Sequence, residues 1–105
     1  FVSGSLTEEE TKAVIKKTYK SYRVLIDPHT AVAVGVANKF NFKRDTVVLA
    51  TAHPAKFSDV VLNATNKKPE LPENLKDILV KKEKFDKLPN ELKKIKNYIF
   101  DKVHK

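Results

Sequence analysis

The chain has 105 residues, of which 41% are hydrophobic, so it is long enough to bury one modest core. It contains no Cys, which excludes a disulfide and a thiolate nucleophile, and its three His lack the spacing of a zinc site. No apolar stretch approaches the roughly 20 residues that span a bilayer, and "FVSGSL" at the start does not resemble a secretory signal. These features predict a cytoplasmic protein that does not enter a membrane.

The charge balance raises the question of a polyanionic partner. There are 21 basic and 13 acidic residues, a net charge of +8, which would attract nucleic acid through long-range electrostatics. Only Arg23 and Arg44 carry the planar guanidinium that reads bases, and the Lys residues alternate with acids, as in "LKDILVKKEKFDK". This pattern favours a solvated surface, and a Lys-rich interaction or nucleic-acid-binding module stays as the alternative function.

The first predicted helix starts after "FVSGSL". Thr7 and Glu10 have the spacing of a capping box, in which each side chain accepts a hydrogen bond from the other residue's backbone. Apolar or half-apolar residues then recur at helical spacing at Val14, Ile15, Thr18, Tyr19 and Tyr22. The chain has no Met and begins with Phe1, so we expect it to derive from something longer.

A second helix is predicted in "DPHTAVAVGVANKF", residues 27–40. Asp27 is the expected N-cap and Pro28 the first helical residue, where the missing N–H of proline has no cost. The alternation of Ala and Val would also suit a strand, but the length and the Asp-Pro start favour a helix. Because this helix is apolar on nearly all sides, we expect it to lie inside a larger body.

Residues 46–50, "TVVLA", are continuously apolar and predict a short buried strand, with "RVLI" at 23–26 as a second candidate. Thr51, Ala52 and His53 would then lie at the carboxyl end of the strand, where open α/β sheets bind ligands. The alternative is that Thr51 or His53 only caps the helix that Pro54 begins. That helix has a predicted inner stripe of Phe57, Val60, Val61 and Ala64.

Beyond a linker at 63–72, "NATNKKPELP", we predict a short helix near "ENLKDIL" and a longer one through "NELKKIKNYIFDKV". The expected organisation is a single unit over 1–105, with a helix/helix/strand/helix core part at 1–65 and the linker and carboxyl-terminal helices at 66–105. The fold class is an α/β fragment, mostly helical with one or two short strands. Because one strand has no partner for its ladder, the rest of the sheet is expected in a longer protein.

Two blocks, "DPHTAVAVGVANKF" and "VVLATAHPAKF", resemble the carboxyl-terminal portion of threonine synthase. "LTEEET", "LPENL" and "LPNELKKIKNYI" support the resemblance, which runs through almost the whole chain but covers only the last part of the family's sequence. It implies part of a fold-type II pyridoxal-phosphate enzyme domain that converts O-phosphohomoserine and water to threonine and phosphate. It also implies that Thr51 faces the ring nitrogen of the cofactor, which a neutral hydroxyl leaves largely unprotonated.

The family's cofactor-binding lysine and glycine-rich phosphate loop belong to earlier segments, and "FKRD" at 42–45 is a charged turn that does not replace them. We therefore predict no catalytic residue here, no tight binding of pyridoxal phosphate by this chain alone, and the missing amino-terminal portion of the enzyme as its partner. Self-association through helices that face a lost neighbour is a further expectation. His29, His53 and Lys56 receive no assigned role.

Overall fold

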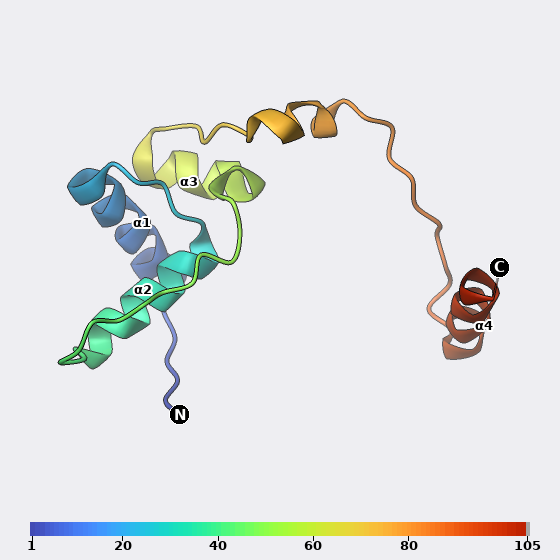
Figure 1. Ribbon diagram of the computed structural model, residues 1–105, viewed down its shortest axis with the longest axis horizontal. Coiled ribbons are helices and arrows are strands. Elements are labelled where there is room, and N and C mark those ends of the chain that lie inside the picture. Colours follow the sequence, from blue (N-terminus) through green and yellow to red (C-terminus); the bar gives the residue numbers. More distant parts are fainter. Residues whose placement is uncertain (105) are drawn as a thin grey trace. The chain divides into compact units, whose positions relative to one another are not determined.

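The computed structural model describes residues 1–104, which form helices joined by extended segments, with no β-strand among them (Figure 1). The chain divides into two compact units, Phe1–Glu73 and a second that starts at Asn74. In chain order the elements are α1 (Glu8–Tyr22), α2 (Pro28–Phe40), the 3-10 helix η1 (Pro54–Phe57), α3 (Ser58–Thr65), the 3-10 helix η2 (Glu73–Leu79) and α4 (Leu92–Val103).

The predicted capping box starts α1. The Thr7 backbone N–H donates to Glu10 Oε2 at 2.7 Å, and the Glu10 backbone N–H donates to Thr7 Oγ1 at 3.2 Å. Three glutamates in the first turn also favour the positive end of the helix dipole. The helix ends at Arg23, whose φ of 58° is left-handed and whose N–H donates to the Tyr19 carbonyl. The start of this helix was therefore correctly predicted.

The predicted start of α2 is also confirmed. Asp27 is the N-cap, with its carboxylate accepting from the N–H of His29 at 2.9 Å and of Thr30 at 3.4 Å, and Pro28 follows in the first turn. Within residues 1–104, burial on this helix is confined to one face, where Thr30, Ala31 and Gly35 lie. The other side of the helix, which the apolar sequence had led us to expect inside a larger body, is half-buried or exposed.

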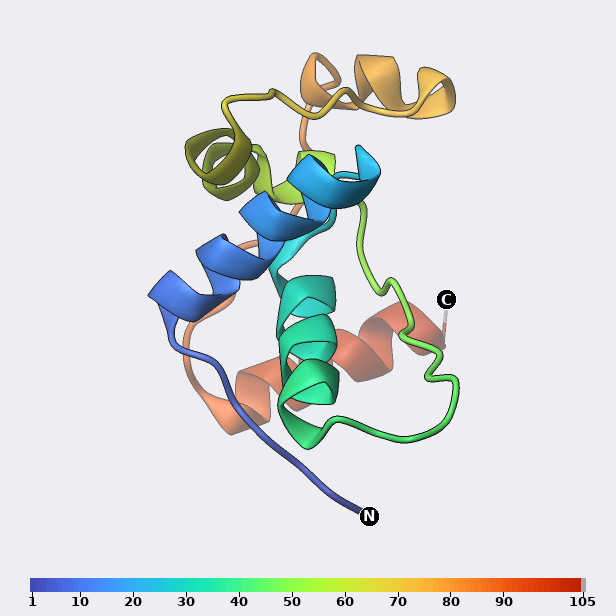
Figure 2. The ribbon, with the colours of Figure 1, turned by 90° about the vertical axis from the view of Figure 1, so that its left-hand side faces the viewer.

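The core of the first unit is where α1 contacts both α2 and α3 (Figure 2). One fully buried apolar side chain comes from each helix: Ile15, Ala31 and Val61. Gly35 permits the close approach of α2, because a Cβ there would lie 2.4 Å from Leu6 Cδ1 and 3.1 Å from Val14 Cγ2. The predicted stripe of α3 is confirmed, with Val61 buried and its neighbours on that face half-buried.

Both predicted strands were wrong, and with them the α/β fold class. Residues 23–26 and 46–50 have no regular secondary structure, so the described part of the chain is helical. Val47 and Leu49, expected in a core, are 87% and 74% exposed. The physical reason is that a strand needs a ladder partner, and none is present among residues 1–104. An apolar run predicts burial but does not supply the neighbouring strand.

The second unit contains α4, a helix that the sequence predicted. Two of its apolar side chains, Leu92 and Val103, are 70% and 72% exposed. The segment before the helix is tied to it by Asp86, which accepts a hydrogen bond from the Tyr98 hydroxyl and lies 3.5 Å from Lys102 Nζ. In the part of the chain that the structure describes, every helix is too short or too polar to cross a bilayer.

Candidate functional site

The two sequence blocks that carry the resemblance meet at one hollow of about 460 Å³. The segment that leads into α2 forms one wall, and the segment that leads into η1 forms the other. The lining residues are Val24, Leu25, Ile26, Asp27, Thr30, Ala50, Thr51, Ala52, His53 and Pro54. Thr51 is thus placed beside the first turn of α2, although the two segments are far apart in the sequence.

Asp27 and Thr30 form the buried polar corner of this hollow. Asp27 is 1% exposed, and its Oδ2 accepts hydrogen bonds from both the hydroxyl and the N–H of Thr30. Burial by itself opposes ionisation of Asp27, but the hydrogen bonds from Thr30 and His29 outweigh burial and hold its pKa below the ordinary value. The carboxylate is therefore an ionised cap of α2 whose oxygens are already occupied.

His53 is the cap of η1. Its Nδ1 accepts a hydrogen bond from the Ala55 backbone N–H at 3.2 Å, and Pro54 follows it as the first residue of that helix. The alternative interpretation of His53 as a capping residue is confirmed. Because Nδ1 is an acceptor, the neutral ring carries its proton on Nε2.

Thr51 does not cap η1. Its side chain is exposed, and it makes no hydrogen bond to another of residues 1–104. Its hydroxyl is consequently available to a ligand in the hollow, unlike that of Thr30, which is committed to Asp27. The role of Thr51 toward a cofactor stays a prediction.

His29 and Lys56 both contact the aromatic ring of Phe57. The edge of His29 packs against Phe57 with ring centroids 4.9 Å apart, while Lys56 Nζ lies 5.7 Å from the centroid of Phe57. His29 Nδ1 is 3.0 Å from Asp27 Oδ1, and 62% of the His29 side chain is exposed. The contact of His29 with Phe57 joins α2 to η1 and gives His29 a structural role, whereas that of Lys56 lies within η1.

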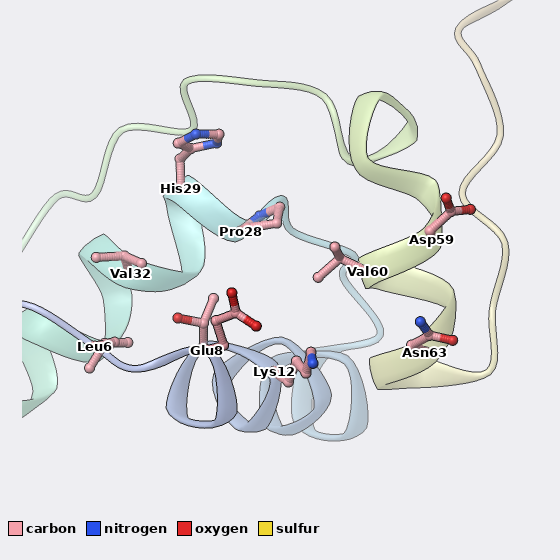
Figure 3. Close-up of a pocket in the computed structure, with 10 residues that line it drawn as sticks. Leu6, Glu8, Lys12, Pro28, His29, Val32, Asp59, Val60 and Asn63 are labelled. Atoms are coloured by element: carbon pink, nitrogen blue, oxygen red, sulfur yellow. The ribbon is translucent and has the colours of Figure 1, made fainter.

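A second hollow, of about 400 Å³, lies between the three helices of the first unit. In Figure 3, Glu8 and Lys12 come from α1, Val32 and His29 from α2, and Val60 from α3. The sequence alone does not reveal this hollow, because separate helices contribute its lining and no local motif marks it.

Comparison with known proteins decides the family. The family model described as "Threonine synthase, C-terminal" matches residues 30–99. This chain belongs to the threonine synthase family. It is 37% identical to the threonine synthase of Corynebacterium glutamicum, over 98% of this chain and 22% of that enzyme.

Two solved structures are similar to this chain. The pyridoxal-phosphate-bound threonine synthase from Brucella melitensis is 43% identical, with a TM-score of 0.75 over 94% of this chain and 22% of that one. The yeast enzyme is 33% identical, with a TM-score of 0.72 over 99% of this chain and 24% of that one. The chain therefore spans less than a quarter of the length of these relatives.

The hollow beside Thr51 suits one edge of an aromatic cofactor ring but not a phosphate. Apolar groups such as Val24, Ile26 and Pro54 line it, and Thr51 adds a free hydroxyl. Its lining, as the described residues form it, contains no Lys or Arg to neutralise a phosphate. These residues thus fit the ring portion of pyridoxal phosphate, and its phosphate would require groups from elsewhere.

Proposed function

We propose that this chain provides the carboxyl-terminal part of a threonine synthase that uses pyridoxal phosphate to convert O-phosphohomoserine and water to threonine and phosphate. The observation that carries the proposal is the exposed Thr51 hydroxyl, which borders a hollow built from the two most family-like blocks of the sequence. Membership of the family over residues 30–99 supports it independently. We also propose that the enzyme is cytoplasmic.

In this proposal Thr51 binds the ring nitrogen of the cofactor. The cofactor supplies an electron sink for bond cleavage next to the amino group of the substrate. A hydroxyl holds the ring nitrogen in place without keeping a proton on it, as a carboxylate would. Asp27 and His53 support Thr51 indirectly, since each caps one of the two helices that border the hollow.

The chain alone is proposed to be inactive. The lysine and the glycine-rich loop that hold the cofactor in this family would come from the missing amino-terminal portion. Titration of the isolated chain with pyridoxal phosphate, followed by borohydride reduction and peptide mapping, tests this. We expect unsaturable labelling of many Lys residues, whereas saturable labelling of one Lys would contradict the proposal.

Activity is tested by producing this chain together with the amino-terminal portion of the Corynebacterium glutamicum enzyme and measuring phosphate release from O-phosphohomoserine. Thr51→Val is expected to lower the rate about two- to tenfold, because a hydrogen bond between two uncharged groups contributes roughly 0.5–1.5 kcal/mol. Thr51→Ser should retain most of the rate. Thr46→Val, at an exposed Thr in the same connecting segment, is the matched control and should leave the rate unchanged.

No phosphate release from the wild-type pair would contradict the proposed reaction. Equal rates for the wild type and Thr51→Val would instead contradict only the role of Thr51. The visible absorbance of the bound cofactor gives a second readout, which should change in Thr51→Val and not in Thr46→Val.

A further inference from the structure

The second hollow, between α1, α2 and α3, combines aliphatic side chains with charged ones. Its volume of about 400 Å³ lies within the range of roughly 300–1,000 Å³ that is usual for small-molecule sites. Leu6, Val32 and Val60 contribute aliphatic surface from three separate parts of the chain. Because burying such surface is favourable, the hollow suits a ligand that carries an aliphatic group.

Glu8 and Lys12 are the charged side chains that α1 contributes to the hollow. They are one helical turn apart, a spacing that puts two Cβ atoms about 5–6 Å from each other on one face. In Figure 3 the Glu8 carboxylate points from α1 toward the side on which Pro28 lies. Neither side chain forms an ion pair or a hydrogen bond within residues 1–104, whereas the nearby Glu10 pairs with Lys39 at 2.8 Å. One side of the hollow therefore offers a ligand an anion and a cation within one turn.

The helix α3 contributes a second pair of polar side chains. Asp59 and Asn63 line the hollow, again four residues apart, and neither side chain bonds to another residue in the described part of the chain. Together with the charges of α1, and apart from His29, the lining carries two carboxylates and one ammonium. A ligand with only a carboxylate would meet two like charges, and one with only an ammonium would meet Lys12. An α-amino acid carries both charges on one carbon and matches both.

We propose that this hollow binds a small aliphatic α-amino acid. The ammonium of the ligand pairs with Glu8 or Asp59, and its carboxylate pairs with Lys12. The side chain of the ligand packs on Val32 and Val60. The charges give the orientation, and the aliphatic surface selects an apolar side chain over a polar one.

The first turn of α2 separates this site from the hollow beside Thr51. Pro28 and His29 line the second hollow, whereas Asp27 and Thr30 line the hollow beside Thr51. A bound amino acid and a cofactor ring would therefore occupy different hollows and would not compete. The inference thus goes beyond the proposed reaction and can fail or hold independently of it.

Titration of the ¹⁵N-labelled chain with L-leucine, followed by amide chemical shifts, tests the site directly. Amides of the residues that line the hollow, on all three helices, should shift together and saturate with a Kd of about 1 mM or less. The amides of α4, which belongs to the second unit, are the internal control and should not shift. Shifts that do not saturate, or that are equally large in α4, would overturn the proposal.

Two analogues of leucine test the need for both charges. The first, 4-methylpentanoate, lacks the ammonium, and the second, 3-methylbutylamine, lacks the carboxylate. Each should bind about two- to fivefold more weakly than L-leucine, the range expected for the loss of an exposed ion pair. Equal affinity of either analogue would overturn the proposal. This series uses the wild-type chain, so it does not depend on the folding of any variant.

Variants of α1 test the protein's side of the same contacts. Glu8→Gln and Lys12→Gln should each weaken the binding of L-leucine about two- to fivefold. Glu9→Gln and Lys16→Gln change exposed residues of the same helix that lie outside the lining, and they should bind like the wild type. Equal affinity of the lining variants and these controls would overturn the proposal.

Filling the hollow provides a steric test. Val32→Phe should abolish binding, whereas Ala33→Phe, at an exposed position of the same helix, should leave it unchanged. Far-ultraviolet circular dichroism verifies that each variant is helical, and retained binding by a folded Val32→Phe would overturn the proposal. Thr51→Val should bind L-leucine like the wild type. Loss of binding in that variant would place the ligand in the other hollow and overturn the proposal as well.

Discussion

The Thr30 side chain donates its hydroxyl hydrogen to the Asp27 carboxylate at the start of α2, where both residues are buried. The same carboxylate accepts the backbone N–H groups of His29 and Thr30. One side chain thus satisfies two orphan donors of the helix and one buried hydroxyl. The "DPHT" motif therefore stabilises the start of α2, and it also lines the hollow beside Thr51.

Asp27→Ala is expected to lower the free energy of unfolding by about 2–4 kcal/mol. Loss of the N-cap accounts for about 1 kcal/mol, and the unpaired Thr30 hydroxyl for a further 1–3 kcal/mol. Asp27→Asn, which still caps, should lose less. Urea unfolding followed by circular dichroism measures the change, with the exposed Asp45→Ala as a control expected to stay within about 0.5 kcal/mol. Equal stability of the wild type and Asp27→Ala would contradict this account.

Because the pKa of Asp27 is lowered in the folded chain, we expect the chain to lose stability in acid. Its pKa in the folded chain lies below the ordinary value of 3.8, so the unfolded chain takes up the proton first as the pH falls. The contribution is complete well above pH 3.8 and is lost as the pH falls through the folded pKa. The stability gap between the wild type and Asp27→Asn should therefore shrink from about pH 6 to pH 3.

Comparing the wild type with Asp27→Asn removes the effect of the other carboxylates whose pKa is lowered. Glu10, 2.8 Å from Lys39 Nζ, also has a lowered pKa because Lys39 and Thr7 bind its carboxylate. It is present in both proteins, so its effect cancels in the difference. A gap that stays constant over the whole range would refute the assignment to Asp27.

Gly35→Val is expected to lower the free energy of unfolding by about 1–3 kcal/mol, the usual effect of overpacking. The added side chain would meet Leu6 and the stiff Val14, which already lie within 2.4 and 3.1 Å of a Cβ at this position. Ala33→Val places the same side chain at an exposed position of the same helix and should lower stability by no more than about 0.7 kcal/mol, the difference in helix propensity. Urea midpoints of the two variants provide the comparison, and similar midpoints would contradict the close packing at Gly35.

In the second unit, the ionisation of Tyr98 is expected to depend on Asp86. The hydrogen bond that Tyr98 donates to Asp86 raises the pKa of the phenol above 10.0. Asp86→Asn should return it toward 10.0, whereas Asp101→Asn on the same helix should have no effect. Tyrosinate absorbance against pH, measured with Tyr19 and Tyr22 replaced by Phe, isolates the signal. An unchanged midpoint in Asp86→Asn would refute the contact.

The sequence predicted the features that depend on neighbours in the chain. Thr7 with Glu10 and Asp27 with Pro28 act within one helical turn, so their types and spacing were sufficient to place two helix starts. The strand at 46–50 was wrong because pairing depends on residues outside the chain's own local sequence. The hollow that joins Asp27 to Thr51 depends likewise on how two distant segments pack, which no periodicity encodes.

The packing of α1 against both α2 and α3 sets an order of assembly. Ile15 and Ala31 can meet as soon as the second helix has left the ribosome, but Val61 is synthesised later. At roughly 5–20 residues per second, the nascent core waits on the order of seconds for its third side chain. During that interval the face of α1 that later packs against α3 is open to solvent, so the nascent chain carries an uncovered apolar surface until Val61 arrives.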